Sequence, residues 1–133
     1  MMLILQTVAV LASLAALTAP ALARQVDERT VPVQFRGEWN ERREDCGTGN
    51  NDSRLRIEAA TIDFYESGGR VRGAFLNGPY EIIIVADLSG EGSTWMDSFQ
   101  FTLAADGSYL STRSEGGTLT RYRCPLTSST RAP

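Results

Sequence analysis

The stretch TWMDSFQFTL, residues 94 to 103, decides the fold class of this chain. From Trp95 onward every second residue is apolar except Asp97, and the residues between them are mostly polar. A period of two is typical of a β-strand with one covered face. The turn sequence Ala-Asp-Gly at 105–107 follows at once, so this stretch predicts one arm of a β-hairpin.

The same alternation recurs along the chain between short clusters of Gly, Asn, Asp and Ser. No segment shows an apolar period of 3.6 residues over three turns, so helices are not expected. The apolar run at 82–86 is continuous, which predicts a strand covered on both faces. We expect eight strands, at 33–39, 54–58, 62–65, 70–75, 82–86, 94–103, 109–112 and 118–124.

Short strands joined by tight turns indicate an all-β antiparallel up-and-down barrel of about eight strands. Without helices, the sheet must curl onto itself or pack as two layers, so a rolled β-sandwich is the alternative. A small chain cannot build both long strands and a large cavity, and we expect a filled interior. Its bulky filling is predicted to come from Phe35, Phe64, Phe75, Phe99, Phe101 and either Ile83 or Ile84.

The first 23 residues are interpreted as a signal peptide, with a nearly unbroken apolar run from Leu3 to Leu17 and Ala-Leu-Ala at 21–23. The run is long enough to be a retained membrane anchor, which is the alternative. Cleavage places the protein in the bacterial periplasm or outside the cell. The expected divisions are a flexible lead at 24–30, one barrel domain at 31–125 and a disordered tail at 126–133.

Cys46 and Cys124 are the two cysteines of the chain. In an oxidising compartment such a pair predicts a disulfide. The alternative is a pair of free thiols that act as metal ligands or as a nucleophile.

The composition disfavours several classes of function. The net charge is −3, so a basic face for nucleic acid is not expected. Histidine is absent, which removes the residue that titrates near neutral pH and the imidazole metal ligand. No cofactor and no metal site are predicted.

Gly37-Glu38-Trp39 lies on the first predicted strand, and Arg121 and Arg123 lie on the last. Here the sequence resembles the calycins, the superfamily of lipocalins, fatty-acid-binding proteins and avidins. The resemblance implies a small barrel whose first-strand tryptophan is covered by a basic residue of the last strand. The chain also resembles small exported proteobacterial proteins of unassigned function, through Phe-x-Gly-x-Trp at 35–39 and Tyr-Glu-Ser-Gly at 65–68.

Asp97 is the one charged residue on the apolar face of its strand. A buried carboxylate is costly unless it is paired, so we expect an ion pair with Arg121 or Arg123, or a bulge that turns Asp97 outward. A catalytic acid with a raised pKa is the functional alternative. Glu66 and Asp87, near strand ends, are further carboxylates for a hydrolase, but their spacing does not place any two together.

The leading hypothesis is a binding module, not an enzyme, for a small apolar ligand at one barrel end or for an envelope protein. A structural envelope protein without a small-molecule site is the second hypothesis, and a carboxylate-based hydrolase is the third. Open space at the barrel mouth would favour a small ligand, whereas an exposed apolar patch would favour a protein partner. The candidate binding residues are Trp39, Trp95, Asp97, Arg121 and Arg123.

Overall fold

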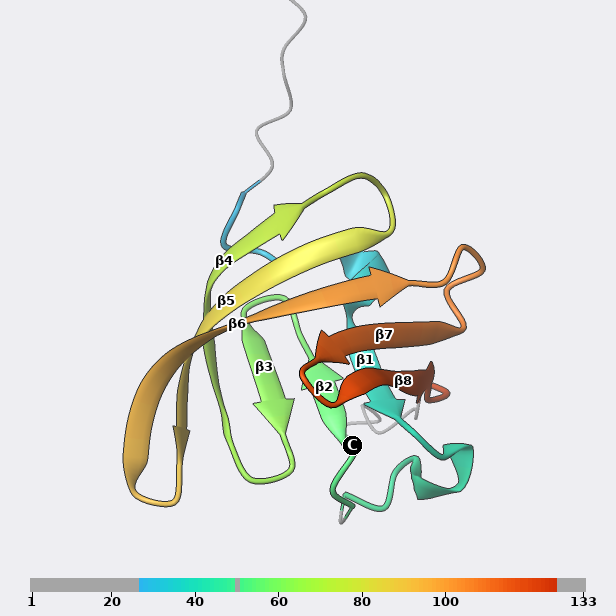
Figure 1. Cartoon of the computed structure of the whole chain (residues 1–133), viewed down its shortest axis with the longest axis horizontal. Helices are drawn as coiled ribbons and strands as arrows, with labels where there is room; N and C mark the ends of the chain where they lie inside the picture. The colour runs from blue at the N-terminus through green and yellow to red at the C-terminus, as the bar shows by residue number, and fades with distance from the viewer. Residues whose placement is uncertain (1–26, 50, 127–133) are drawn as a thin grey trace, which may run out of the picture.

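The computed structural model describes residues 27–49 and 51–126, which form a closed barrel of eight antiparallel strands in sequence order (Figure 1). This confirms the up-and-down barrel and excludes the two-layer sandwich. The strands are β1 (Gly37–Asn40), β2 (Leu55–Ile57), β3 (Thr61–Phe64), β4 (Gly68–Leu76), β5 (Glu81–Gly90), β6 (Ser93–Leu103), β7 (Tyr109–Ser114) and β8 (Gly117–Arg123). Two 3-10 turns, η1 (Val33–Phe35) and η2 (Arg43–Asp45), flank β1.

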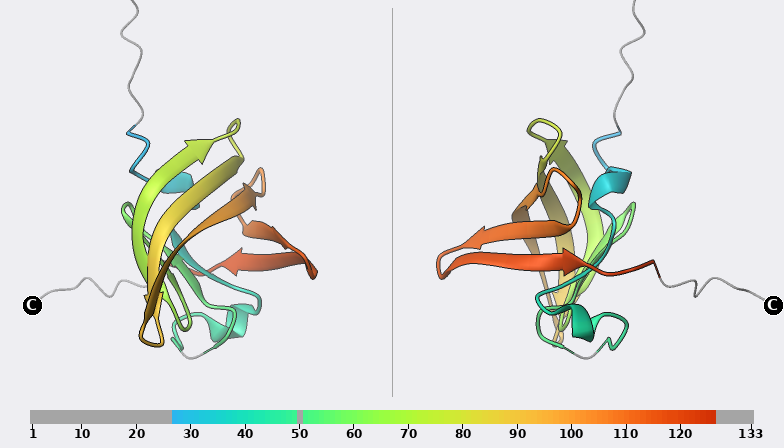
Figure 2. Two further views of the ribbon diagram at one scale, coloured as in Figure 1. Left: turned by 60° about the vertical axis from the view of Figure 1, so that its left-hand side comes forward. Right: turned by 90° about the vertical axis from the view of Figure 1, so that its right-hand side faces the viewer.

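The barrel is closed unevenly. The β5–β6 ladder runs from Glu81↔Thr102 to Gly90↔Ser93, whereas β1 meets β8 in a ladder of only two pairs, Trp39↔Arg123 and Asn40↔Tyr122. The β6–β7 ladder is also short and ends at Phe101↔Thr112. Beyond it the β7–β8 hairpin projects away from the body of the barrel (Figure 2).

Side chains from β1 through β7 fill the interior. Together with Val31 and Phe35, which lie before β1, they form one buried apolar cluster. Phe64 and Phe99 are partly buried and pack against it, with their ring centroids 4.8 Å apart. The cluster contains Val31, Phe35, Trp39, Leu55, Ile57, Ile62, Val71, Ala74, Ile82, Ile84, Ala86, Leu88, Phe101, Leu103 and Leu110.

The strand expected at 33–39 is wrong in its first half, where the chain forms η1. Pro32 starts this 3-10 turn, and Phe35 is buried while Val33 is exposed. Gly37 then takes a φ of 131°, a conformation that glycine reaches without a steric penalty. This allows the chain to change direction between η1 and β1.

A bulge in β4 overturns the expectation that Phe75 fills the interior. The β4–β5 register passes from Val71↔Ala86 to Gly73↔Val85, so one extra residue shifts the alternation. Ala74 is therefore buried and Phe75 is exposed.

The expectation that 82–86 is covered on both faces is also wrong. Ile82 and Ile84 are buried, but Ile83 between them is exposed. The strand follows the ordinary alternation of a barrel whose outer face meets solvent.

The part of the expected flexible lead that is described, 27–30, is a hydrogen-bonded turn. The Asp27 carboxylate accepts hydrogen bonds from the Arg29 backbone N–H and the Thr30 hydroxyl, each at 3.0 Å. The Ala74 N–H donates to the Glu28 carbonyl at 2.5 Å, which ties the turn to β4. The signal peptide, residues 24–26 and the tail beyond Leu126 lie outside the described residues. Across 27–49 and 51–126, no helix has the length and apolar character needed to cross a membrane.

Gly69 lies in β4 between Ile62 of β3 and Leu88 of β5. A Cβ atom at this position would overlap the backbone carbonyl of Asp87, which cannot move without shifting β5. We therefore expect Gly69→Ala to lower the free energy of unfolding by about 1–3 kcal/mol, the usual cost of overpacking. Urea unfolding followed by tryptophan fluorescence measures this change.

The matched control is Gly116→Ala in the β7–β8 turn, where the nearest atom to a new Cβ is Ser114 Oγ at 3.9 Å. This variant should remain within about 0.5 kcal/mol of the wild type. Equal stability of the two variants would contradict the close β4–β5 approach.

Candidate functional site

Trp39 and Arg123 meet at the end of the barrel that η1 covers. The Arg123 guanidinium carbon lies 4.1 Å from the centroid of the Trp39 ring, which confirms the expectation that a last-strand arginine, Arg121 or Arg123, covers Trp39. Arg123 also donates three hydrogen bonds to backbone carbonyls: Nε to Gly107 at 2.9 Å, Nη1 to Arg36 at 2.7 Å and Nη2 to Gln34 at 2.5 Å. Burial lowers the pKa of Arg123 from its ordinary value, but an arginine side chain stays protonated in proteins.

This arrangement plugs one end of the barrel. Trp39 is completely buried, and its indole N–H donates to the Phe35 carbonyl at 3.2 Å. Phe35 is also fully buried and belongs to the core cluster. Trp39 thus presents no surface to a ligand here; it closes the barrel.

Arg121 is almost completely buried on the inner face of β8. Its Nε donates to the Ser53 carbonyl at 2.6 Å and its Nη1 to Thr112 Oγ1 at 3.5 Å. Burial lowers the pKa of Arg121, and the nearby charge of Glu41 acts in the opposite direction. Arg121 therefore links the segment before β2 to β7.

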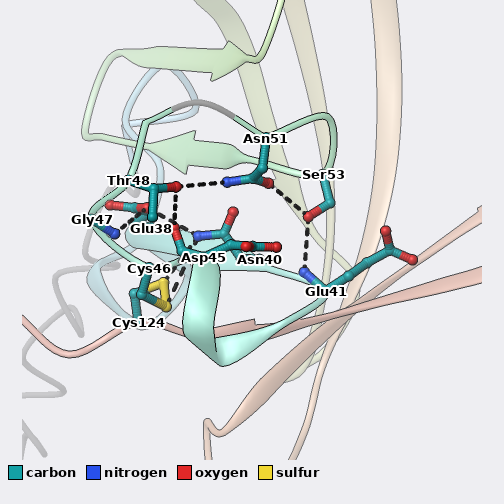
Figure 3. Close-up of a disulfide and its surroundings, with 10 residues drawn as sticks. All are labelled: Glu38, Asn40, Glu41, Asp45, Cys46, Gly47, Thr48, Asn51, Ser53 and Cys124. Carbon is teal, nitrogen blue, oxygen red and sulfur yellow. Dashed lines mark hydrogen bonds between the residues drawn. A yellow bond between two sulfur atoms is a disulfide. The ribbon is translucent and has the colours of Figure 1, made fainter.

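The predicted disulfide between Cys46 and Cys124 is confirmed, with a Cα–Cα distance of 5.5 Å (Figure 3). This excludes the alternative of two free thiols. Buried Asn40 lies beside the disulfide, and its Nδ2 donates to Cys124 Sγ at 3.1 Å and to Glu38 Oε1 at 3.0 Å. Glu38 Oε1 also accepts from the Gly47 N–H at 3.1 Å, so the loop that follows β1 folds over the bond.

Trp95 and Asp97 lie elsewhere, on the exposed first half of β6. Asp97 pairs in regular register with Ala86, so the expected bulge is absent from the β5–β6 ladder. Its Oδ1 accepts a hydrogen bond from the Ser98 backbone N–H at 2.8 Å, and among the described residues no ion pair with an arginine is found. Both expectations for Asp97 are wrong. The strand β6 continues beyond the last residue that pairs with β7, and the inner face of this extension, which carries Asp97, is exposed.

The structure does not bring the five predicted residues into one site. Trp39 and Arg123 form the plug, Arg121 is buried beside them on β8, and Trp95 and Asp97 are exposed on β6. Within the described parts of the chain, no group of three or more Asp, Glu, Cys or His residues is placed to hold a metal ion.

Sequence reasoning missed an exposed apolar surface on the β4–β5 hairpin, which we call the hairpin patch. Phe75 of β4 pairs directly with Ile83 of β5 on the outer face, and the Phe75 ring lies over Gly73. The patch consists of Phe75, Leu76, Tyr80 and Ile83, with exposed fractions of 45, 42, 47 and 39%.

An open groove of about 950 Å³ borders this patch, and its lining includes Phe75, Leu76 and residues 27–29. If residues 82–86 had been interpreted as an alternating strand, the sequence would have predicted that Ile83 faces solvent. For the bulge that turns Phe75 outward, the available signal was Gly73, because a glycine inside a strand often marks a bulge.

Comparisons with protein-family models, with curated proteins and with solved structures each found no match.

Proposed function

We propose that this protein is an extracytoplasmic binding module whose target is another protein rather than a small apolar ligand. The observation that carries this proposal is the hairpin patch, four large apolar side chains exposed on one hairpin beside an open groove. Phe75 and Ile83 form a cross-strand pair on the outer face, and exposed apolar surface gathered in this way marks interaction sites in soluble proteins.

The filled interior supports a protein target over a small ligand. A small apolar ligand at one barrel end needs open space at the barrel mouth, but Trp39 and Phe35 fill the end that η1 covers and, like Phe101, are completely buried. The groove beside the hairpin patch lies on the outer surface. A small apolar ligand inside the barrel would have to displace core side chains, whereas a protein surface can cover the patch as it is.

The carboxylates considered for a hydrolase do not favour one. Asp87 forms an ion pair with Arg72 on the outer face, and the Asp97 carboxylate accepts a hydrogen bond from the Ser98 backbone N–H. The hydrolase is therefore not proposed, and we propose a non-enzymatic role in the periplasm or outside the cell.

Ile83→Thr tests the role of the hairpin patch. The change keeps a β-branched residue on an exposed strand position, so the free energy of unfolding should change by less than about 1 kcal/mol. Loss of the apolar contact should weaken partner binding by about tenfold or more. Native mass spectrometry of protein recovered from its own compartment measures the partner-bound fraction.

Leu126→Thr is the matched control, because Leu126 is an exposed apolar residue that follows the last strand. It should retain the partner like the wild type. Recovery of the wild type with a bound small molecule and no protein would contradict the proposal.

A further inference from the structure

The first half of β6 has a free backbone edge. In an antiparallel sheet, the N–H and C=O groups of successive residues point to alternate sides of the strand. The Leu103 N–H donates to Tyr80 on the β5 side at 2.7 Å, and the Ala104 N–H donates to Tyr109 on the β7 side at 2.9 Å. By this alternation, the backbone N–H and C=O groups of Thr94, Met96 and Ser98 point away from β5, toward the side on which β7 pairs with the end of β6.

No strand of the described chain pairs with that edge. The β6–β7 ladder ends at Phe101↔Thr112, and the β7–β8 hairpin then diverges from β6 (Figure 2). Thr94, Met96 and Ser98 are all exposed. Three N–H and three C=O groups at strand spacing therefore face a seam that is open to solvent.

We propose that the edge of β6 accepts an extended segment of another polypeptide as an added strand, with the side-chain pattern apolar-x-basic-x-apolar. The inference rests on the proposed protein-binding function and names how the partner is held. Main-chain hydrogen bonds supply affinity in this mode, and alternate side chains supply specificity.

The pattern follows from the inner face of β6. Trp95, Asp97 and Phe99 are consecutive residues of that face, and each would form a non-hydrogen-bonded pair with the added strand. Side chains in such pairs are close, so apolar residues fit opposite Trp95 and Phe99 and a basic residue fits opposite Asp97.

Asp97 also shows how the edge is protected when it is empty. Its carboxylate accepts the Ser98 N–H, one of the three edge donors that no strand pairs with. An incoming carbonyl would take over that N–H, and the basic side chain of the added strand would take over the carboxylate. An inward-pointing charge on an edge strand discourages unselective pairing.

A second copy of this chain does not fit the edge. Antiparallel self-pairing centred on Asp97 sets the two Asp97 carboxylates opposite each other, and like charges in that position are destabilising. The neighbouring registers set Asp97 opposite Trp95 or Phe99 instead. Charge complementarity therefore favours a foreign strand with a basic residue.

The hairpin patch lies on the same sheet as this edge. Gly73, Val85 and Ser98 form one row across β4, β5 and β6, and the Phe75 ring lies over Gly73. A strand added beside Ser98 continues the outer face that carries Phe75 and Ile83. One partner can thus contact both surfaces.

Selection from a phage-displayed library of random heptapeptides against the folded protein tests the proposal. We expect enriched sequences with the apolar-x-basic-x-apolar pattern. Synthetic copies should lose at least tenfold in affinity when the backbone nitrogens that face β6 are methylated, because side chains stay unchanged and edge hydrogen bonds are blocked.

Two variants distinguish pairing with the β6 edge from nonspecific peptide binding. Ser98→Pro removes an N–H that faces the seam and takes no part in the β5 ladder, so the fold should persist while peptide binding falls at least tenfold. Asp97→Lys should change the preferred central residue from basic to acidic in a repeated selection.

The proposal is overturned if no peptide is enriched, if the enriched peptides bind Ser98→Pro as they bind the wild type, or if Asp97→Lys leaves the central preference unchanged. A dimer of the wild type that Ser98→Pro abolishes would show that the occupant is a second copy. A natural partner that depends on Ile83 but not on Ser98 would overturn this inference and leave the proposed function standing.

Discussion

Replacing Cys46 and Cys124 together by serine is expected to lower the free energy of unfolding by about 4 kcal/mol. The two cysteines are 78 positions apart, and the chain-entropy model gives about 4.5 kcal/mol for a loop of that length. The total stability of a domain is about 5–15 kcal/mol, so this loss is large. The effect should be strong because the β1–β8 ladder that the bond supports has only two register pairs.

Urea unfolding of the wild type and of the double serine variant measures this loss. Wild-type protein unfolded with a reductant present should match the variant, which controls for the substitutions themselves. A loss below about 1 kcal/mol would mean that the strands alone hold the barrel closed.

The second large effect is expected at Arg123. Arg123→Ala should lower the free energy of unfolding by about 3–5 kcal/mol, because three backbone carbonyls lose a charged donor and the Trp39 ring loses its cover. Arg123→Lys should recover only part of this loss, since an ammonium group cannot reproduce the planar fork of the guanidinium. Urea unfolding measures both variants.

Arg113→Ala is the control, because Arg113 is an exposed arginine near the tip of the β7–β8 hairpin. It should change the stability by no more than about 0.5 kcal/mol. If Arg123→Ala were equally mild, the plug would not contribute to closing the barrel.

Most of the fold can be predicted from the sequence, because period-2 alternation and turn residues report local structure directly. Residues 94–103 behave as the alternation predicts from Phe99 to Leu103. The 3-10 turn at Val33–Phe35 escaped prediction because its residues also alternate, and only the need to cover the barrel end distinguishes it. The bulge in β4 escaped for a similar reason, since it depends on how β4 and β5 fit together.

The closed end of the barrel was also predictable. In an up-and-down barrel the first and last strands are neighbours, which brings Trp39 to Arg123 and Cys46 to Cys124. Asp97 and Trp95 were misplaced because the sequence does not state how far β6 extends beyond its partner β7. The hairpin patch was not predicted for the same reason, because the exposure of Phe75 depends on how β4 pairs with β5.

Photocrosslinking from position 83 tests the central claim, that the outer surface of a filled barrel binds a protein. A photoreactive benzoylphenylalanine would replace Ile83 in one strain and Thr118, exposed on the β7–β8 hairpin, in another. Cells of the native host are then irradiated, and adducts are identified by mass. The account predicts one recurring protein adduct from position 83 that is absent from position 118; no protein adduct from position 83, or the same adducts from both positions, would contradict it.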